Sequence, residues 1–241
     1  MLEVNGLQSG YGDLQILWDI RLHVDQGEYV VLLGPNGAGK TTTLRTISGI
    51  IRPSGGNITF KGQPIHHMSA HQISQLGISY ITEDLNLFPK MTVMDNLLVG
   101  AHTIKDKEKI KKTLESVMAL FPRLKERLNQ LAGTLSGGER KMLGIGRGLM
   151  SDPELLLVDE PSLGLSPLMT QVTFDALQTL NKRGVSILLV EQHLGKALEM
   201  TQRGYVIEHG QIVMHGPTRD LLESVRVKEV YLGKAGGKAL D

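Results

Sequence analysis

The sequence predicts an α/β protein whose core is interrupted by an all-helical segment. Two short apolar runs, 29–33 and 155–158, have the length and composition of buried strands, and segments of helical periodicity lie between them. Residues 19–24 alternate between apolar and polar, which is typical of a half-buried antiparallel strand. From about residue 84 to residue 151 the periodicity is helical without a convincing strand, so this block is interpreted as an insertion.

The composition excludes several classes of protein. The 241 residues, 41% of them hydrophobic, suit one large α/β domain, or one domain with an inserted subdomain. The 26 basic and 25 acidic residues give a net charge of +1, which does not indicate a nucleic-acid partner. The absence of cysteine excludes disulfides, thiol catalysis and zinc–thiolate sites. Because the sequence shows neither a signal peptide nor an apolar run of ~20 residues, any membrane role is expected to be peripheral.

The first predicted elements are strands at 2–7 and 19–24, joined by a turn-rich link that contains Tyr11. Strand 29–33 leads into a glycine-rich loop, and a helix from Thr41 to Ser48 follows. The loop fits the pattern G-x-x-x-x-G-K-[ST] of nucleoside-triphosphate-binding proteins, and it has the strand before it and the helix after it that this motif requires. Its residues are Gly34-Pro35-Asn36-Gly37-Ala38-Gly39-Lys40-Thr41.

These residue types suit a triphosphate. Glycines let the backbone adopt positive φ angles and bring its N–H groups close to phosphate oxygens, and the helix start adds donors. Lys40 is expected to reach the β- and γ-phosphates, and the Thr41 hydroxyl to ligate Mg²⁺. Tyr11 either stacks on the adenine ring or packs in the core. A turn that binds nothing is the competing interpretation of the loop.

Further elements follow in order up to the end of the helical block. A turn at 53–56 and a strand at 57–60 precede a helix at 69–76 capped by Ser69 and a strand at 78–81. Within the helical block, Thr92 is predicted to cap a helix that ends near residue 101. A helix at 105–120, whose lysines are expected to form a solvated face, ends at Phe121-Pro122. A further helix starts at Leu135-Ser136 and runs to about residue 150.

Two acidic residues end the next buried strand. Asp159 is placed to hold Mg²⁺ or its water, and Glu160 to act as the general base for the attacking water. The alternative is a strand that ends in solvent-exposed acids. The segment Leu135-Ser136-Gly137-Gly138-Glu139 opens a helix with exposed N–H donors and suggests a second anion-binding site, although such a turn is often only a helix cap.

The remaining predicted elements complete an α/β pattern. They are a helix at 168–182, a strand at 186–190, a helix at 194–201, a hairpin of strands at 204–208 and 211–215, and helices near 218–223 and 226–232. The glycine- and lysine-rich tail at 234–241 is expected to be mobile.

In its motifs the sequence resembles the ATP-binding subunits of ABC transporters. In that family a phosphate-binding loop, a Leu-Ser-Gly-Gly signature and a Walker B Asp-Glu pair occur in this order, as they do here over residues 2–233. The resemblance implies a P-loop NTPase core of the ABC ATPase type, with an antiparallel β subdomain and an inserted α-helical subdomain. The boundaries are 1–83 and 152–233 for the core and 84–151 for the helical subdomain.

The resemblance also implies a head-to-tail dimer with two ATP molecules at its interface. One subunit contributes Tyr11, Gly34, Pro35, Asn36, Gly37, Ala38, Gly39, Lys40, Thr41 and Thr42, and the other contributes Ser136, Gly137, Gly138 and Glu139. The residues implied for Mg²⁺ are Thr41, Asp159 and Glu83, and Glu83 stands where the family usually has the Q-loop glutamine. A carboxylate at that position is still able to bind the metal or its water.

The catalytic switch position departs from the family pattern. The alignment of Val190-Glu191 places Gln192 where the family has a histidine, and His193 comes one residue later. Glutamine is able to donate to the γ-phosphate but cannot become an imidazolium. Both residues therefore remain candidates, and Gln192 is favoured. Ser166 replaces the usual aspartate of the family's D-loop.

Particular segments resemble the shorter ATPase of bacterial branched-chain amino-acid importers, among them Glu83, 161–167, Val190-Glu191-Gln192 and Tyr231-Leu232-Gly233. That resemblance implies transmembrane permease subunits, a second ATPase as partner in a heterodimer, or a homodimer, and a periplasmic or extracellular binding protein that acts indirectly. It places the chain on the cytoplasmic face of the inner or plasma membrane. Urea and amide importers have similar ATPases, so they remain an alternative, as does a soluble ABC ATPase without a transport role.

Overall fold

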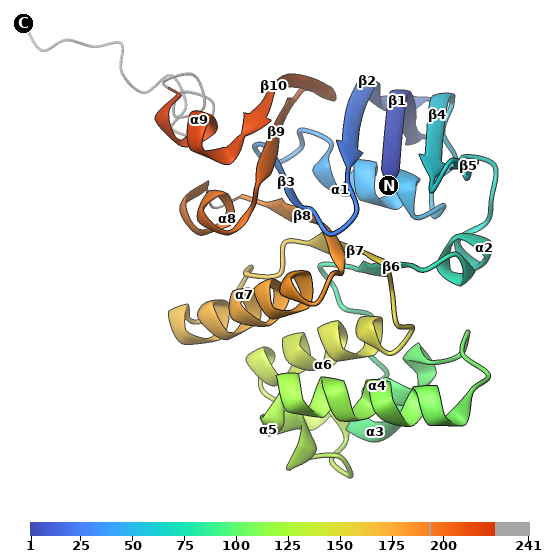
Figure 1. Ribbon diagram of the computed structural model, residues 1–241, viewed down its shortest axis with the longest axis vertical. Helices are drawn as coiled ribbons and strands as arrows, with labels where there is room; N and C mark the ends of the chain where they lie inside the picture. Colours follow the sequence, from blue (N-terminus) through green and yellow to red (C-terminus); the bar gives the residue numbers. More distant parts are fainter. Residues whose placement is uncertain (193, 225–241) are drawn as a thin grey trace, which may run out of the picture. The chain divides into compact units, whose positions relative to one another are not determined.

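The computed structural model describes residues 1–192 and 194–224. His193, the helix expected at 226–232 and the tail at 234–241 lie outside the described residues. The chain divides into two compact units, which we call unit 1 (Met1–His67 with Leu188–Asp241) and unit 2 (Met68–Ile187) (Figure 1). Each unit is described by itself. The predicted boundaries at residues 83/84 and 151/152 remain a prediction.

Unit 1 is built on a mixed sheet. Its strands lie in the order β5 (Gln63–Pro64), β4 (Gly55–Phe60), β1 (Leu2–Tyr11), β2 (Leu14–Val24), β10 (Gln211–Pro217), β9 (Arg203–Glu208) and β3 (Tyr29–Leu33). β1 is antiparallel to both β2 and β4, which confirms the expected antiparallel portion. β3 runs parallel to β9, with Val30 opposite Arg203. β3 is buried throughout because its five apolar residues lie inside the sheet.

The link predicted between residues 7 and 19 is wrong, because most of it is strand. β1 continues to Tyr11, and β2 starts at Leu14. The turn between them contains Gly12 at φ 56°. Polar residues on the exposed face and glycines hide the strand pattern in the sequence, while Leu7 and Leu17 are fully buried. Tyr11 therefore lies at the tip of a long hairpin.

Three helices lie within the described residues of unit 1. They are α1 (Lys40–Ile47), α8 (Leu194–Met200) and α9 (Thr218–Glu223). α1 packs on β1 and β2, and the Thr46 hydroxyl donates to the Ser9 hydroxyl at 2.9 Å across this buried contact. Leu44 and Ile47 of α1 are fully buried. This packing fixes the start of α1 close to the end of β3, which positions the loop between them.

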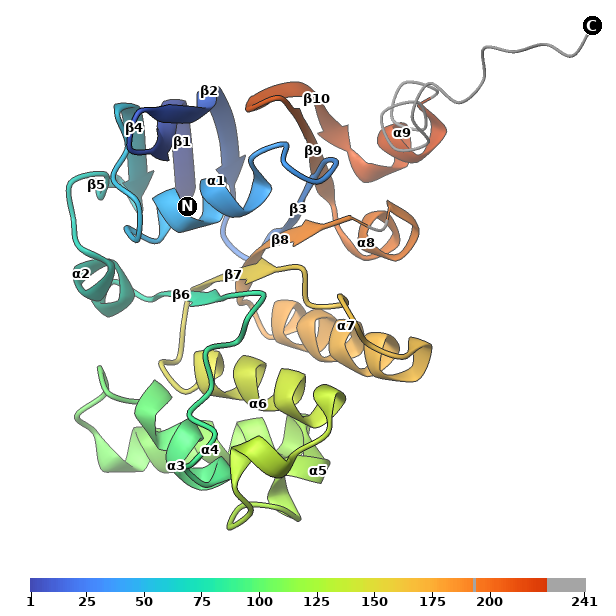
Figure 2. The same ribbon diagram turned by 180° about the vertical axis from the view of Figure 1, so that it is seen from behind.

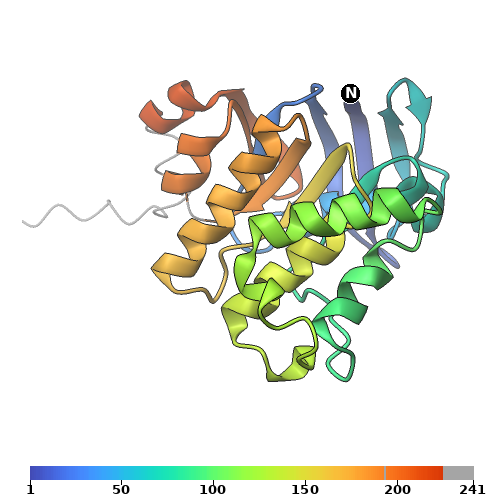
Figure 3. The same ribbon diagram turned by 60° about the horizontal axis from the view of Figure 1, so that its bottom comes forward.

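Unit 2 combines a short parallel strand pair with a group of helices (Figure 3). β6 (Ile78–Ile81) pairs in parallel with β7 (Leu155–Asp159), and Ile78 lies opposite Leu155. The helices are α2 (Ala70–Gln75), α3 (Val93–Gly100), α4 (Lys107–Leu120), α5 (Pro122–Lys125), the 3₁₀ turn η1 (Ala132–Thr134), α6 (Gly137–Leu149) and α7 (Pro167–Lys182). α6 contacts α3, α4, α5 and α7, so it is the central helix of the group. β8 (Ser186–Glu191) begins in unit 2 and ends in unit 1.

The predicted helix starts are confirmed by their caps. Ser69, Thr92 and Ser136 each form a reciprocal capping box with the residue three positions later. The predicted end of the lysine-rich helix at Phe121-Pro122 is incomplete as a description, because a second short helix, α5, starts at Pro122. Proline suits the first turn of a helix, where its missing N–H group has no partner to lose. Among the described residues, no helix has both the length and the apolar character needed to cross a bilayer.

Candidate nucleotide-binding and hydrolysis site

The glycine-rich loop lies in unit 1 between the end of β3 and the start of α1 (Figure 2). Gly37 and Gly39 have φ angles of 78° and 110°, which residues with a Cβ atom rarely adopt. Gly34 is needed for a different reason, because a Cβ atom there would lie 2.4 Å from the carbonyl oxygen of Ile207. The path of the loop thus depends on glycine at all three positions.

Lys40 places a buried positive charge in this loop. The residue is 4% exposed, and its ammonium group donates to the carbonyl oxygens of Gly34 and Pro35 at 2.9 and 3.1 Å. Gly39, the N-cap of α1, provides no side-chain cap, so the first N–H groups of the helix are not used by a capping side chain. The loop therefore combines a lysine with backbone donors, which is the chemistry that binds phosphate.

Tyr11 is exposed at the tip of the β1–β2 hairpin. The residue is 44% exposed, and the Tyr11 hydroxyl accepts a hydrogen bond from Arg45 of α1 at 3.2 Å. The alternative of a tyrosine packed in the core is therefore wrong. An exposed ring tied to the helix that carries Lys40 remains available for stacking.

The switch region follows β8. Glu191 is 1% exposed, and its carboxylate accepts a hydrogen bond from the backbone N–H of Gln192 at 3.2 Å. Burial, and secondly the charge of Glu191, raises the pKa of Tyr29. Because His193 lies outside the described residues, the choice between Gln192 and His193 stays a prediction.

The two acids of the predicted hydrolysis site lie at the end of β7 in unit 2. Asp159 is 1% exposed, and its carboxylate accepts a hydrogen bond from the Tyr80 hydroxyl at 2.8 Å. Glu160 is 6% exposed and has a φ angle of 44°, in the left-handed region that is unfavourable for a residue with a long side chain. The interpretation of these acids as solvent-exposed is therefore wrong. Buried acids with backbone strain are typical of functional sites.

Glu83 contributes a third carboxylate to this acidic region. Glu83 is exposed, but its carboxylate loses some hydration to neighbouring protein; this, and then the charges of Glu160, Asp159 and Asp84, raises the pKa of Glu83, while the charge of Lys141 opposes the rise. Such an accumulation of negative charge suits a cation. Among the described residues, no three His, Cys, Asp or Glu side chains are arranged to hold a metal ion by themselves.

The signature segment forms the N-terminus of α6 in unit 2. The Ser136 hydroxyl donates to the Glu139 carboxylate at 2.8 Å, and Arg127 donates to the same carboxylate at 2.6 Å. The Ser136 backbone N–H also donates to this carboxylate, at 2.9 Å. This backbone bond is the largest cause that lowers the pKa of Glu139; the Ser136 hydroxyl and Arg127 lower it further, and burial opposes them. Glu139 thus serves the cap of α6, while a Cβ atom added to Gly137 would meet nothing within 4 Å. The start of α6 is open at Gly137.

The structure adds three residues that the motifs do not identify. Tyr80 reaches Asp159 because β6 is paired with β7, and Arg127 reaches Glu139 across 12 residues of sequence. Lys141 is 4% exposed, and its ammonium group lies 3.3 Å from the carbonyl oxygen of Glu160. Of these three residues, Lys141 alone could have been noticed in the sequence, because a lysine next to the apolar run 142–145 is unusual in a buried helix.

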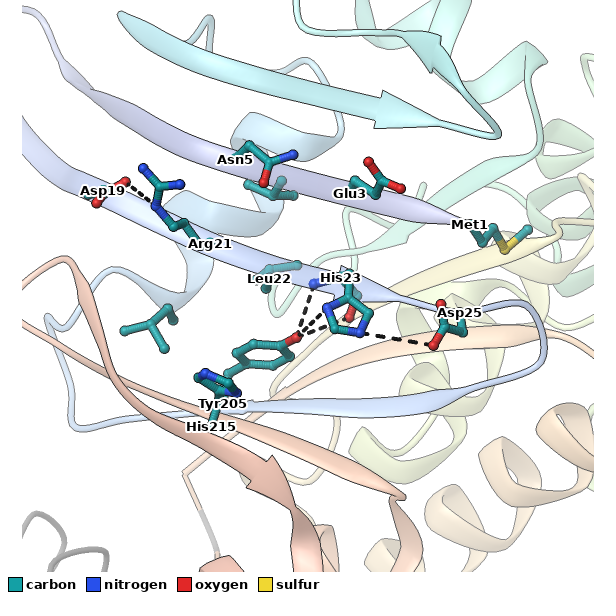
Figure 4. A pocket seen from close by; sticks show the side chains of 12 residues that line it. Met1, Glu3, Asn5, Asp19, Arg21, Leu22, His23, Asp25, Tyr205 and His215 are labelled. Carbon is teal, nitrogen blue, oxygen red and sulfur yellow. Dashed lines mark hydrogen bonds and ion pairs between the residues drawn. The ribbon is translucent and has the colours of Figure 1, made fainter.

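A separate cavity of about 570 Å³ lies in unit 1 on the sheet face formed by β1, β2, β9 and β10 (Figure 4). The Tyr205 ring stacks on His215, with 5.7 Å between the ring centroids, and the Tyr205 hydroxyl lies 3.1 Å from His23 Nδ1. None of the predicted site residues that the structure describes lines this cavity. It is therefore distinct from the phosphate-binding loop.

The fold and the loop define a nucleotide-binding ATPase cassette. The family model described as "ABC transporter" matches residues 17–163. A solved structure, the ADP conformation of MJ1267, an ATP-binding cassette of an ABC transporter, superposes with a TM-score of 0.84 at 26% identity, covering 97% of this chain and 99% of that one.

Two curated relatives span nearly the whole chain. The high-affinity branched-chain amino acid transport ATP-binding protein BraG of Pseudomonas aeruginosa is 42% identical over 233 residues, which cover 97% of this chain and 100% of BraG. The probable branched-chain amino acid transport ATP-binding protein LivF of Archaeoglobus fulgidus is 34% identical over 97% of this chain and 99% of that protein. This chain belongs to the ABC transporter family, whose ATP-binding subunits bind nucleotide and hydrolyse ATP. The predicted family and fold class are thereby confirmed.

Proposed function

We propose that this chain is the ATP-hydrolysing subunit of an importer for branched-chain amino acids. The observation that carries the proposal is the full-length 42% identity to BraG, whose name states this role. The sequence segments described above agree with it, because they resemble the shorter ATPase of such importers.

In this proposal the residues of unit 1 bind ATP. Backbone N–H groups of 34–39 and the start of α1 hold the phosphates, and Lys40 leaves its two loop carbonyls to meet the β- and γ-phosphates. Thr41 and Thr42 complete the loop, and Tyr11 stacks on the adenine ring. The positive φ angles of Gly37 and Gly39 support this role, since they let the backbone turn its N–H groups toward a phosphate without a side chain in the way.

The acids of unit 2 perform hydrolysis. Glu160 accepts the proton of the attacking water, and its buried position excludes competing solvent. Thr41, Asp159 and Glu83 are the residues that hold Mg²⁺, which when bound neutralises charge on the phosphates. Tyr80 orients the Asp159 carboxylate through its 2.8 Å hydrogen bond. Gln192 or His193 contacts the γ-phosphate, and Ser136, Gly137, Gly138 and Glu139 act on the nucleotide of a partner subunit.

The partners follow from the same family role. The chain pairs with a second ABC ATPase, or with itself, and docks peripherally on transmembrane permease subunits at the cytoplasmic face of the membrane. Residues 84–151 act as the helical subdomain that transmits closure to the permease, and an external binding protein delivers the solute. Rigid-body movement driven by a bound γ-phosphate is an established kind of nucleotide switch.

The experiment that tests the transport role is affinity capture of the tagged chain from detergent-solubilised native membranes, with the untagged chain as control. Mass spectrometry is expected to identify two multi-span proteins and a second ATPase. Recovery of ribosomes, DNA-associated factors or only soluble proteins contradicts the transport role and leaves the ATPase activity standing.

The cargo is tested with the captured complex reconstituted in vesicles. We expect ATP-dependent uptake of leucine, isoleucine or valine, and none when the subunit carries Glu160→Gln. Uptake of urea or a short amide in place of these amino acids contradicts the branched-chain assignment.

A further inference from the structure

The segment Glu83–Phe88 in unit 2 is held by side chains of two helices. Asn96 of α3 is fully buried, and its amide accepts from the Phe88 N–H at 2.9 Å and donates to the Phe88 carbonyl at 3.0 Å. The amide of Asn96 thus satisfies both backbone groups of Phe88, as a neighbouring strand would. The C-terminal end of the segment is anchored to α3.

The middle of the segment is strained. Leu85 and Asn86 have φ angles of 58° and 46°, and neither is glycine. Backbone conformations of this kind cost about 1–3 kcal/mol each and persist only where the surroundings enforce them. Asparagine tolerates this region, but leucine has no side-chain group that compensates. Some other part of unit 2 must hold these two residues.

Arg147 of α6 provides that restraint. Its Nη1 donates to the carbonyl oxygen of Asn86 at 2.7 Å, and its Nη2 donates to the carbonyl oxygen of Leu85. The guanidinium carbon also lies 5.8 Å from the centroid of the Phe88 ring. Burial lowers the pKa of Arg147, so the charge is partly removed from water. In the part of the chain that the structure describes, the hydrogen bonds of this guanidinium go to these two carbonyls rather than to a carboxylate.

The same face of α6 supports the segment at two further points. The Lys141 ammonium lies 3.5 Å from the Glu83 carbonyl oxygen. Gly144 leaves room for Leu85, because a Cβ atom on Gly144 would lie 2.6 Å from Leu85 Cδ2. Residues 141, 144 and 147 are spaced by three, so they follow one another along one side of the helix. α6 therefore controls the course of the backbone from Glu83 to Asn86.

We propose that Arg147 is a positioning residue that fixes the Glu83–Phe88 segment in its strained conformation and thereby keeps the Glu83 carboxylate ready for Mg²⁺. The inference rests on the proposed role of Glu83 at the hydrolysis site. It predicts that loss of the guanidinium frees the segment and lowers the affinity of the nucleotide-bound chain for Mg²⁺, without weakening the Mg²⁺-free binding of ATP.

The test compares Arg147→Met, Arg147→Lys and the control Arg123→Met, which removes an exposed arginine of the same unit. Hydrogen–deuterium exchange of the peptide that contains 83–88 is measured without nucleotide. Binding of a fluorescent ATP analogue is then titrated with and without Mg²⁺. For Arg147→Met we expect at least about tenfold faster exchange, the scale of losing one hydrogen bond to a charged donor. We also expect the Mg²⁺ concentration at half-maximal effect on analogue binding, the Mg²⁺ midpoint, to rise by about three- to tenfold. Binding of the analogue without Mg²⁺ is expected to stay within about twofold of wild type.

Each outcome is decisive. Arg147→Lys keeps the charge but not the two-pronged donor, so it is expected to restore exchange only in part. Unchanged exchange, faster exchange with an unchanged Mg²⁺ midpoint, or full rescue by lysine overturns the proposal. If Arg147→Met does not fold, Arg147→Lys alone still tests exchange and the Mg²⁺ midpoint. Failure of the wild-type chain to bind the ATP analogue contradicts the proposed nucleotide site instead, so the two failures are distinguishable.

Discussion

At the residue scale, Glu160 combines three properties that a general base at this position needs. It follows a buried strand, it is almost fully buried itself, and its backbone is held at a positive φ angle. The Lys141 ammonium lies 3.3 Å from the Glu160 carbonyl oxygen, which helps to hold that backbone. Strain of this kind is retained where a side chain must point in one direction.

The first prediction concerns this carboxylate. Glu160→Gln keeps the shape and burial of the side chain but cannot accept a proton, so ATP turnover is expected to fall at least about 100-fold. Steady-state hydrolysis and equilibrium ATP binding are measured in parallel, with exposed Glu126→Gln as control. ATP affinity is expected to stay within about threefold of wild type. A near-normal turnover rate excludes Glu160 as the base.

Lys40 yields a second prediction at this scale. Lys40→Met replaces the buried stem with an apolar chain of similar length, so the fold is expected to persist while ATP binding weakens at least about tenfold, the scale of losing a charged phosphate contact. Exposed Lys182→Met serves as the control. If both variants bind ATP equally well by calorimetry, the loop does not hold the triphosphate through Lys40.

At the scale of elements, the start of α6 depends on a charged cap. The pKa of Glu139 in the folded chain lies below its ordinary value of 4.5. Its ionised form therefore stabilises the fold at pH values above about 4.5, and this contribution disappears as the pH falls toward the folded-state pKa. Glu139→Gln is expected to lower the free energy of unfolding by about 1–2 kcal/mol at pH 7, with the difference shrinking below pH 4.5. Urea unfolding at several pH values measures this, and a constant difference contradicts it.

Two glycine-to-alanine substitutions, one at the contact between α3 and α6 and one in α8, are expected to change stability in opposite directions. A Cβ atom on Gly100 would lie 2.0 Å from the Arg147 carbonyl oxygen, so Gly100→Ala is expected to cost about 2–3 kcal/mol. A Cβ atom added to Gly195 in α8 would meet nothing within 4 Å, and Gly195 has no positive φ angle, so Gly195→Ala is expected to gain up to about 1 kcal/mol. The urea midpoints of the two variants are expected to move in opposite directions, and a shift in the same direction contradicts the packing argument.

Elements whose signals are local could be predicted from the sequence. The caps at Ser69, Thr92 and Ser136, and the buried strand 29–33, need only neighbouring residues to be recognised. The long β1–β2 hairpin could not be predicted, because its partners across the sheet decide which polar residues belong to strand. The contacts of Arg147 and Tyr80 also escape prediction, since they join residues 61 to 79 positions apart.

At the scale of the whole molecule, the motifs predicted the family because they occur in a fixed order along the chain. Their order does not predict the division into units, in which residues 34–42 belong to unit 1 and Glu83, Ser136 and Glu160 to unit 2. Burial could not be predicted either. Asp159 and Glu160 are buried, whereas a strand that ends in two acids is equally compatible with exposure to solvent.

The last prediction belongs to the working assembly. A glutamine at the switch position donates a hydrogen bond but cannot carry a proton, so a site completed by Gln192 is expected to turn over slowly on its own. We expect the chain alone to hydrolyse ATP at least about tenfold more slowly than in the presence of its partner ATPase, the scale on which a missing acid–base group acts.

Gln192→Ala is expected to reduce the rate of the paired ATPases more than His193→Ala does. Turnover with and without the partner decides the first point, and equal rates would show that the chain does not depend on a second ATPase. A larger loss in His193→Ala would assign the switch to the histidine instead.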